Sequence, residues 1–110
     1  MTRVPLPDSF LKLPIAHRAL HDRAQGRIEN SAQAVKAAVA AGYGIEVDLQ
    51  LSSDGVPMVF HDEALDRLTE ESGPINTRTA ADLGRIRLKG STDTIPILTE
   101  ILALIGSKVP

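Results

Sequence analysis

The chain has 110 residues, of which 43% are hydrophobic, and twelve basic residues against fourteen acidic ones give a formal net charge of -2. This length predicts one small domain with a real core, and the lack of a basic patch argues against a nucleic-acid-binding protein. The absence of cysteine excludes disulfides, thiolate metal sites and a cysteine nucleophile. No segment reaches membrane-spanning length and the N-terminus lacks a signal-peptide core, so we expect a cytoplasmic protein without a membrane span.

The first third of the sequence predicts a strand followed by a helix. Residues 1–12 are expected to form a polar lead-in segment, and the apolar run Leu13–Ala16 predicts a short buried strand. The helix is predicted to begin at Asn30 as its N-cap, with Gln33 in the capping-box position, and to end at Gly42.

The next segment, residues 44–51, places two acids within a strongly β-prone run. If the whole segment is one strand, Glu46, Asp48 and Gln50 share one side and the apolar residues share the other. Carboxylates beside an apolar face are costly unless they are neutralised, and a divalent cation with oxygen ligands is the simplest compensation. The order strand, helix, strand predicts a βαβ unit with a parallel pair.

A β-hairpin is predicted to follow, with its turn at 53–55 and its second strand at 56–60. A two-residue turn would place His61 opposite Asp48, and a four-residue loop would place it opposite Glu46. A loop of odd length would turn His61 away from the acidic face unless a bulge corrected the register.

The last part of the chain predicts loops and two helices. Residues 64–76 are acidic and turn-rich, a helix is predicted to start at Thr79, and residues 89–94 form a polar loop. A final helix is predicted with Thr99 as its cap and Gly106 as its end.

Strand order and hairpin pairing predict that five residues meet at one edge of the sheet: His17, Arg18, Glu46, Asp48 and His61. Each alone has an ordinary structural explanation, but a cluster of titratable groups is typical of a functional site. Glu29 could either stabilise the helix dipole or support the site, and His21 is expected to be a loop residue or a group that supports the site residues. Asp62 and Arg67 are expected to belong to a solvated loop.

Motifs spread over residues 13–105 resemble, in the same order, those of the glycerophosphodiester phosphodiesterases: His17-Arg18, Glu29-Asn30, Gly44–Asp48, Asp54–Pro57, Val59–Asp62, Leu65–Arg67, Gly73–Ile75 and Ile95-Pro96. Ordered motifs of this kind are far more specific than any single one. Three positions depart from the family pattern, since Ala19 stands where glycine is usual, Ile28 where proline is usual and Thr99 where glutamate is common. These departures indicate a divergent subfamily.

The resemblance implies a (β/α)8 TIM barrel that hydrolyses a glycerophosphodiester to an alcohol and glycerol 3-phosphate with the help of a divalent cation, Ca²⁺ or Mg²⁺. By position, Glu46 and Asp48 would be metal ligands, and Arg18 would hold the phosphate of this small-molecule substrate. His17 and His61 would be the general acid and base. Two alternatives are a non-catalytic partner or regulatory module that keeps these residues, and a phospholipase D-like lyase acting on lysolipids.

A complete (β/α)8 barrel needs about 250 residues. Residues 1–110 are therefore predicted to form a single incomplete domain, the N-terminal part of such a barrel with an inserted β-hairpin, too short to close. The family's further acidic metal ligand would lie outside this chain. We expect the chain by itself to bind metal weakly, to be poorly active or inactive, and to associate with the remainder of a barrel or with a second copy.

Overall fold

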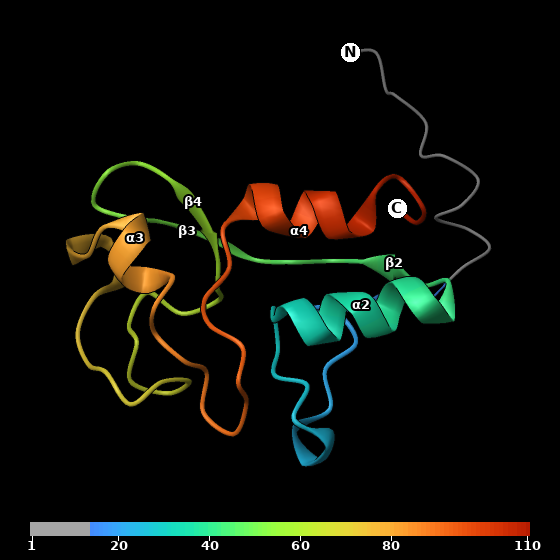
Figure 1. The fold of residues 1–110 in the computed structure, drawn as a ribbon, viewed down its shortest axis with the longest axis horizontal. Coiled ribbons are helices and arrows are strands. Elements are labelled where there is room, and N and C mark those ends of the chain that lie inside the picture. The colour runs from blue at the N-terminus through green and yellow to red at the C-terminus, as the bar shows by residue number, and fades with distance from the viewer. Residues whose placement is uncertain (1–13) are drawn as a thin grey trace, which may run out of the picture.

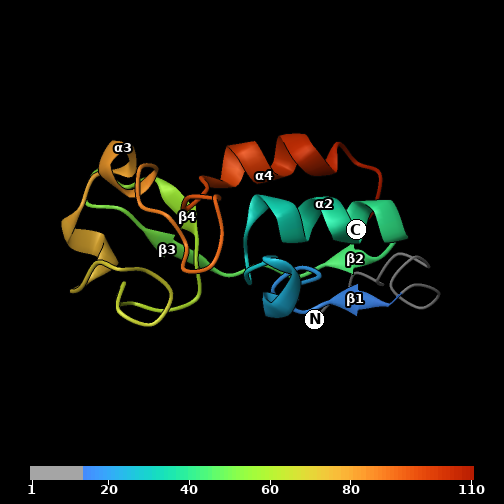
Figure 2. The same cartoon turned by 60° about the horizontal axis from the view of Figure 1, so that its bottom comes forward.

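The computed structural model describes residues 14–110, so the expected lead-in 1–12 lies outside the described residues. The elements, in chain order, are β1 (Ile15–Ala16), the 3-10 turn η1 (Arg23–Gln25), α2 (Ala32–Ala41), β2 (Gly44–Ile45), β3 (Leu49–Leu51), β4 (Pro57–Val59), the 3-10 turn η2 (Ile75–Thr77), α3 (Ala80–Leu83) and α4 (Leu98–Ile105). They form two lobes (Figures 1 and 2). The barrel lobe contains β1, α2, β2 and α4, and the hairpin lobe contains β3, β4, η2 and α3.

The barrel lobe confirms the predicted strand, helix, strand unit. β1 pairs in parallel with β2, with Ile15 opposite Gly44 and Ala16 opposite Ile45. α2 buries its apolar side against β2 and against α4. The amide of Ile45 also donates to the carbonyl of Pro110 at 2.6 Å, so the last described residue lies along the other edge of β2.

The predicted cap of α2 is wrong by one residue. The hydroxyl of Ser31 accepts a hydrogen bond from the Ala34 amide at 3.2 Å, which makes Ser31 the N-cap. Gln33 does not complete a capping box. Its backbone amide instead donates to the Asp93 carboxylate at 2.9 Å. The end of the helix at Gly42 is confirmed, because this residue has a φ of 74° and adopts the left-handed conformation that glycine tolerates.

The predicted single strand over 44–51 is broken in the middle. β2 ends at Ile45 and pairs with β1, whereas β3 begins at Leu49 and pairs with β4. The three residues between them cross from one lobe to the other, and the amide of Asp48 is satisfied by a side chain, the Asn30 carbonyl oxygen, at 3.1 Å. The acidic segment is a crossing rather than a continuous strand because its two halves pair with different strands.

The hairpin has a loop of odd length, so both even-length registers are wrong. Leu49 lies opposite Val59 and Leu51 opposite Pro57, and the Ser52 amide donates to the Val56 carbonyl at 3.0 Å. Three residues, 53–55, therefore form the loop. The pairing continues as far as the amide of Phe60, after which the chain leaves the strand.

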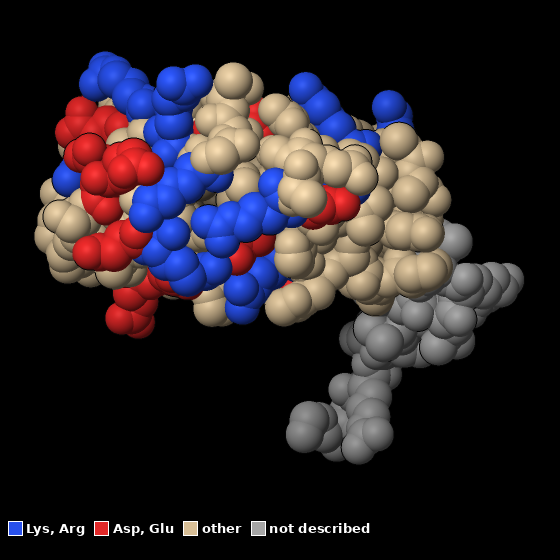
Figure 3. Space-filling view, turned by 90° about the horizontal axis from the view of Figure 1, so that it is seen from below, with Lys and Arg blue, Asp and Glu red and all other residues tan. Residues whose placement is uncertain are grey.

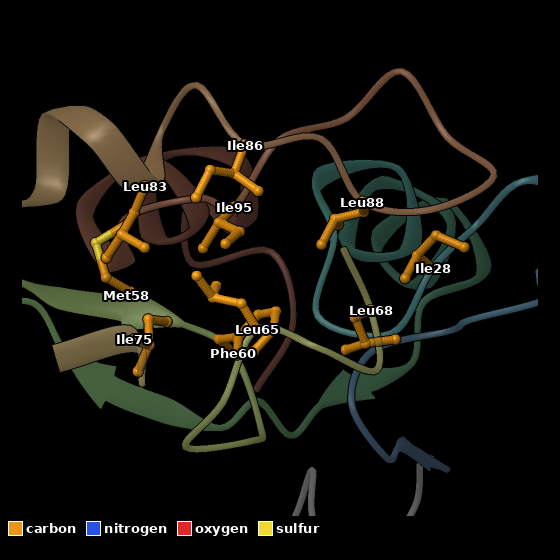
Figure 4. Close-up of a cluster of buried hydrophobic side chains, with 10 residues drawn as sticks. All are labelled: Ile28, Met58, Phe60, Leu65, Leu68, Ile75, Leu83, Ile86, Leu88 and Ile95. Atoms are coloured by element: carbon orange, nitrogen blue, oxygen red, sulfur yellow. The ribbon is translucent and has the colours of Figure 1, made fainter. Parts of the chain in front are cut away.

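The hairpin lobe encloses its own hydrophobic core (Figure 4). Its ten buried members come from β4, the following loops and α3, together with one residue that precedes α2: Ile28, Met58, Phe60, Leu65, Leu68, Ile75, Leu83, Ile86, Leu88 and Ile95. Ile28, one of the departures from the family pattern, is thus a core residue that bridges towards the barrel lobe.

The last two helices differ in how they begin. The Thr79 hydroxyl accepts from the Asp82 amide at 3.2 Å, which confirms the predicted cap of α3. Thr99 does not cap α4, since that helix starts at Leu98 after Ile97 and has no side-chain cap. Gly106 ends it, as predicted. None of the helices formed by residues 14–110 is long and apolar enough to cross a membrane.

Candidate active site at the junction of the two lobes

The predicted site residues of the barrel lobe lie together where β1 and β2 end. The His17 ring nitrogen Nε2 is 3.4 Å from Glu46 Oε2, and the Arg18 amide donates to the same oxygen at 3.2 Å. The Arg18 Nε atom is 3.7 Å from Asp48 Oδ2. The parallel pair therefore brings these residues to one edge, as strand order predicts.

The turn after β1 is tightly shaped. Arg18 and Ala19 both have positive φ, at 55° and 64°, and the Ala19 amide donates to the Glu46 carbonyl at 2.9 Å. The family's usual glycine would adopt this conformation without strain. In this chain the alanine methyl is buried in the core of the barrel lobe, and this burial offsets part of the steric cost.

Asn30 belongs to the site, although the sequence predicted it only as a helix N-cap. Its amide nitrogen donates to Asp48 Oδ2 at 3.2 Å, and its carbonyl oxygen accepts from the Asp48 backbone amide at 3.1 Å. This reciprocal pair fixes the Asp48 carboxylate and the crossing segment at once. Asn30 has a φ of 58°, a conformation that asparagine tolerates. The available signal was the neighbouring Ser31, an equally good cap that left Asn30 free for another partner.

His61 reaches the site by leaving the hairpin rather than by pairing across it. The Gln50 side chain donates to the His61 carbonyl at 2.9 Å and holds the backbone there. The His61 Nε2 atom is 3.0 Å from Arg18 Nη2, and its Nδ1 atom is 2.8 Å from Asp62 Oδ1. Because arginine can only donate, Nε2 must accept, so we assign the proton to Nδ1, where it is donated to Asp62.

Glu29 and Arg67 close a ring of hydrogen bonds. Arg18 Nη1 donates to Glu29 Oε2 at 3.0 Å, and Arg67 donates to both Glu29 oxygens at 2.7 and 3.0 Å. Arg67 also donates to both oxygens of Asp62, at 2.8 and 3.0 Å. We call these five residues the arginine ring: Arg18, Glu29, Arg67, Asp62 and His61. Asp62 and Arg67 lie in a loop, as expected, and the Arg67 side chain is 46% exposed, but their place in this ring was not predicted. Glu29 lies within the site.

The ring holds its acids in their charged forms. Burial of Glu29 acts to raise the pKa of its carboxyl, but the hydrogen bonds and charges of Arg67 and Arg18 outweigh burial and lower that pKa. The hydrogen bonds from Arg67 lower the pKa of Asp62 to about 2. His21, by contrast, lies exposed in the turn before Asp22, as expected for a loop residue.

The site has a strongly mixed charge. Four carboxylates, from Glu29, Glu46, Asp48 and Asp62, face two guanidinium groups, which leaves a formal charge of -2. Across residues 14–110 no group of three or more His, Asp or Glu side chains is arranged to hold a metal ion. On the face drawn in Figure 3, acidic and basic side chains are interleaved over the side of the molecule that carries the hairpin lobe, and uncharged residues cover much of the other side.

Residues 17–109 match the model of the glycerophosphoryl diester phosphodiesterase family, and the chain belongs to this family. It is 36% identical over 103 residues to a glycerophosphodiester phosphodiesterase of Caldanaerobacter subterraneus subsp. tengcongensis, covering 87% of this chain and 41% of that relative. It is 32% identical over 99 residues to human glycerophosphodiester phosphodiesterase 1, covering 81% of this chain and 29% of the relative. The chain thus spans less than half the length of these relatives.

Solved structures agree on the fold. A glycerophosphoryl diester phosphodiesterase from Parabacteroides distasonis superimposes with a TM-score of 0.80 at 28% identity, over 88% of this chain and 35% of the other. An Oleispira antarctica phosphodiesterase in complex with the product sn-glycerol-3-phosphate gives a TM-score of 0.76 at 30% identity, over 91% of this chain and 43% of the other. The described residues are therefore part of a TIM barrel, and their two small sheets do not close into a barrel by themselves. This confirms the predicted fold class.

Proposed function

We propose that this chain forms the catalytic edge of a phosphoric diester hydrolase that, in a complete barrel, cleaves glycerophosphodiesters to an alcohol and glycerol 3-phosphate. The observation that carries the proposal is the position of Arg18. Its guanidinium lies between the acids of the barrel lobe and His61 of the hairpin lobe, within 3.0 Å of His61 Nε2 and 3.7 Å of Asp48 Oδ2. A phosphate bound to Arg18 would therefore lie beside both groups.

Arg18 is suited to hold the phosphate. Its planar fork can donate two parallel hydrogen bonds to phosphate oxygens. Its buried Nε atom has no hydrogen-bond partner among residues 14–110, and its Nη2 atom contacts only a neutral imidazole nitrogen. An anionic phosphate oxygen is a stronger hydrogen-bond acceptor than the imidazole nitrogen of His61. Binding of the substrate phosphate would therefore give Arg18 stronger hydrogen bonds than it has without substrate.

The two histidines supply proton transfer in this proposal. His61 presents an unprotonated Nε2, while Nδ1 is held by Asp62, an arrangement that orients a general base. The side chain of His17 is 71% exposed and lies beside Glu46, so it can approach the other side of a bound phosphodiester. One histidine takes the proton from the attacking oxygen, and the other gives a proton to the leaving alkoxide.

The acids Glu46 and Asp48 would hold a divalent cation. Their oxygens suit Mg²⁺, which proteins bind through one or two carboxylates and substrate phosphate oxygens, or Ca²⁺ with ligands added from the rest of a barrel. The site's formal charge of -2 would repel an anionic phosphodiester, and one divalent cation neutralises that charge. Such a cation would stabilise negative charge developing on the phosphate oxygens.

We also propose that residues 14–110 act as one incomplete domain that the remaining strands and helices of a barrel complete. A groove of about 400 Å³ runs between β2 and α4, and apolar side chains line most of it: Ile45, Val47, Leu98, Ile101, Leu102, Ile105, Val109 and Pro110. Further βα units of the same barrel would cover this groove. A small-molecule substrate and a barrel remainder are therefore the expected partners.

The test uses a joined barrel, in which this chain continues at its C-terminal end into the remaining residues of the Caldanaerobacter relative. We expect hydrolysis of glycerophosphocholine that requires Mg²⁺ or Ca²⁺. His17→Ala and His61→Ala should each lower kcat by about 10²- to 10⁴-fold, as expected for loss of an acid or base. His21→Ala, a change to the exposed third histidine, is the matched control and should leave kcat unchanged.

Two other outcomes would point to the alternatives. A folded joined barrel that hydrolyses no glycerophosphodiester with either cation would contradict the proposal and favour a non-catalytic module. Release of a cyclic phosphate from a lysolipid as the final product would favour a phospholipase D-like lyase. Product analysis by ³¹P NMR separates these cases.

A further inference from the structure

We propose that Arg67 is a positioning residue for this reaction: by bridging Glu29 and Asp62, it makes Arg18 and His61 face the same substrate phosphate. The catalytic part of this inference rests on the proposed function. The positional part concerns only the contacts within this chain and can be tested without any turnover.

The geometry sets Arg67 apart from other surface arginines. Its guanidinium makes four hydrogen bonds to two carboxylates, between 2.7 and 3.0 Å, and uses Nε and both terminal nitrogens. Arg78 and Arg85 each pair with one carboxylate through one nitrogen. Paired contacts of this kind fix the direction of both partners and not only their distance.

The two acids come from different lobes. Glu29 precedes α2 and is only 10% exposed, whereas Asp62 follows β4. Each acid orients a different site residue, because Glu29 accepts from Arg18 and Asp62 accepts from His61. Arg67 is thus the group that links the orientation of the phosphate-binding arginine to that of the histidine.

Charge gives a second reason for Arg67. Without it, Arg18 would be the one guanidinium of the ring left to neutralise both Glu29, which it already contacts, and Asp62. Arg18 would then be held by carboxylates and less available to phosphate, and the formal charge of the site would become more negative. A lysine at position 67 would restore the charge but could not bridge two carboxylates with fixed geometry. The two effects can therefore be separated by substitution.

The first experiment uses the 110-residue chain and measures the His61 tautomer by long-range ¹H–¹⁵N NMR at neutral pH. We expect the Nδ1–H form to dominate, and its population to fall in both Arg67→Lys and Arg67→Met. Arg78→Lys and Arg78→Met are matched controls, because Arg78 pairs with Glu71 away from the ring. Thermal unfolding of each variant confirms that it is folded. An unchanged tautomer in both folded Arg67 variants would overturn the positional part.

The second experiment measures kcat and KM in the joined barrel. Arg67→Lys should lower kcat by about 10- to 100-fold, the usual effect of removing a group that orients site residues, with KM within about twofold. Arg67→Met should lower kcat similarly and also raise KM, because a positive charge is lost. A kcat for Arg67→Lys equal to that of the wild type would overturn the inference. An inactive wild-type joined barrel would instead count against the proposed function, and the tautomer measurement would still decide the positional part.

Discussion

The two lobes of this protein are stabilised in different ways. The hairpin lobe has a closed core of ten buried side chains, and two of its largest members, Met58 and Phe60, are almost completely inaccessible. The barrel lobe has five buried core residues, of which four are alanine or valine, and a surrounding set of half-buried side chains: Val39, Ile45, Val47, Leu98, Leu104 and Ile105. The hairpin lobe therefore has a closed core, whereas the barrel lobe has one apolar side that is not covered.

This difference explains where the candidate site lies. The hairpin lobe brings His61, Asp62 and Arg67 to the junction in a loop packed on a closed core. The barrel lobe brings Arg18 in the turn after β1 and Asp48 in the segment that follows β2. Functional groups placed on a rigid element keep their geometry better than groups on a mobile one. The hairpin insertion therefore serves as a support against which the open barrel edge is aligned.

Phe60→Ala should have the largest effect on stability, because it removes the largest buried side chain of the closed core. We expect a loss of about 3–5 kcal/mol in the free energy of unfolding, measured by urea denaturation. Val59→Ala is the matched control: Val59 is the adjacent residue of the same segment but belongs to the core of the barrel lobe, and its loss should be about 1.5–3 kcal/mol.

Hydrogen exchange would show whether the two cores are separate. Phe60→Ala should reduce amide protection mainly in β3, β4 and α3, and Val59→Ala mainly in α2 and α4. Equal loss of protection in both lobes from either change would mean that they unfold as one unit, and would break the comparison.

Asn30→Ala should have the next largest effect, because Asn30 ties the barrel lobe to the crossing segment. The change removes both hydrogen bonds to Asp48 and leaves an alanine at a φ of 58°. We expect a loss of about 1–3 kcal/mol from the lost bonds, and about 1 kcal/mol more from backbone strain. Asn30→Gly keeps the backbone conformation free of strain and isolates the hydrogen-bond contribution. A smaller loss for Asn30→Ala than for Asn30→Gly would contradict this account.

Acid should weaken the contact between the lobes through Asp62. Its pKa is about 2 in the folded protein, below the ordinary value of 3.8, so the carboxylate stabilises the folded state above about pH 4. That contribution is lost as the pH falls from about 4 towards 2. We expect about 1 kcal/mol, since the pair is partly exposed to solvent. Asp62→Asn should remove this part of the pH dependence, and parallel wild-type and mutant curves would be the contrary result.

Leu102→Gln should have the smallest effect, because Leu102 is 55% exposed on the open side of the barrel lobe. In the 110-residue chain, the free energy of unfolding should change by less than about 0.5 kcal/mol. In the joined barrel, where further βα units would cover this side, the same change should cost more. Equal costs in the two proteins would show that this face stays exposed, and would remove the contrast between an open and a closed lobe.

Most elements of the fold could be predicted from the sequence, since they depend on local patterns. Apolar runs located β1, α2 and α4, Gly42 and Gly106 marked the C-terminal ends of the two helices, and strand order predicted the parallel pairing. The loop length of the hairpin could not be predicted, because Asp54-Gly55 fits loops of two, three or four residues. The break in the acidic strand depends on which partner each half finds, and that is decided by tertiary pairing.

The candidate site was predictable as a set of residues but not as a network. The edge of a parallel sheet is a strong constraint, and it places Arg18 beside Glu46 and Asp48 without further information. The contribution of Arg67 depends on a contact with Glu29, 38 residues earlier in the chain. Neither charge nor spacing distinguishes such an arginine from a solvated one. Asn30 was missed for a related reason, because its cap propensity already provided a sufficient local explanation.

The bond between Gln33 and Asp93 has a consequence for the order of folding. The backbone amide of Gln33, near the start of α2, finds its carboxylate acceptor 60 residues later, in the loop 91–94 between the core residues Leu88 and Ile95. During synthesis, α2 emerges long before this partner, so its N-terminus stays incompletely capped until the hairpin lobe has been made. Closing so long a loop is slow relative to helix formation. The native α2 is therefore expected to become fully protected only after the hairpin lobe has folded.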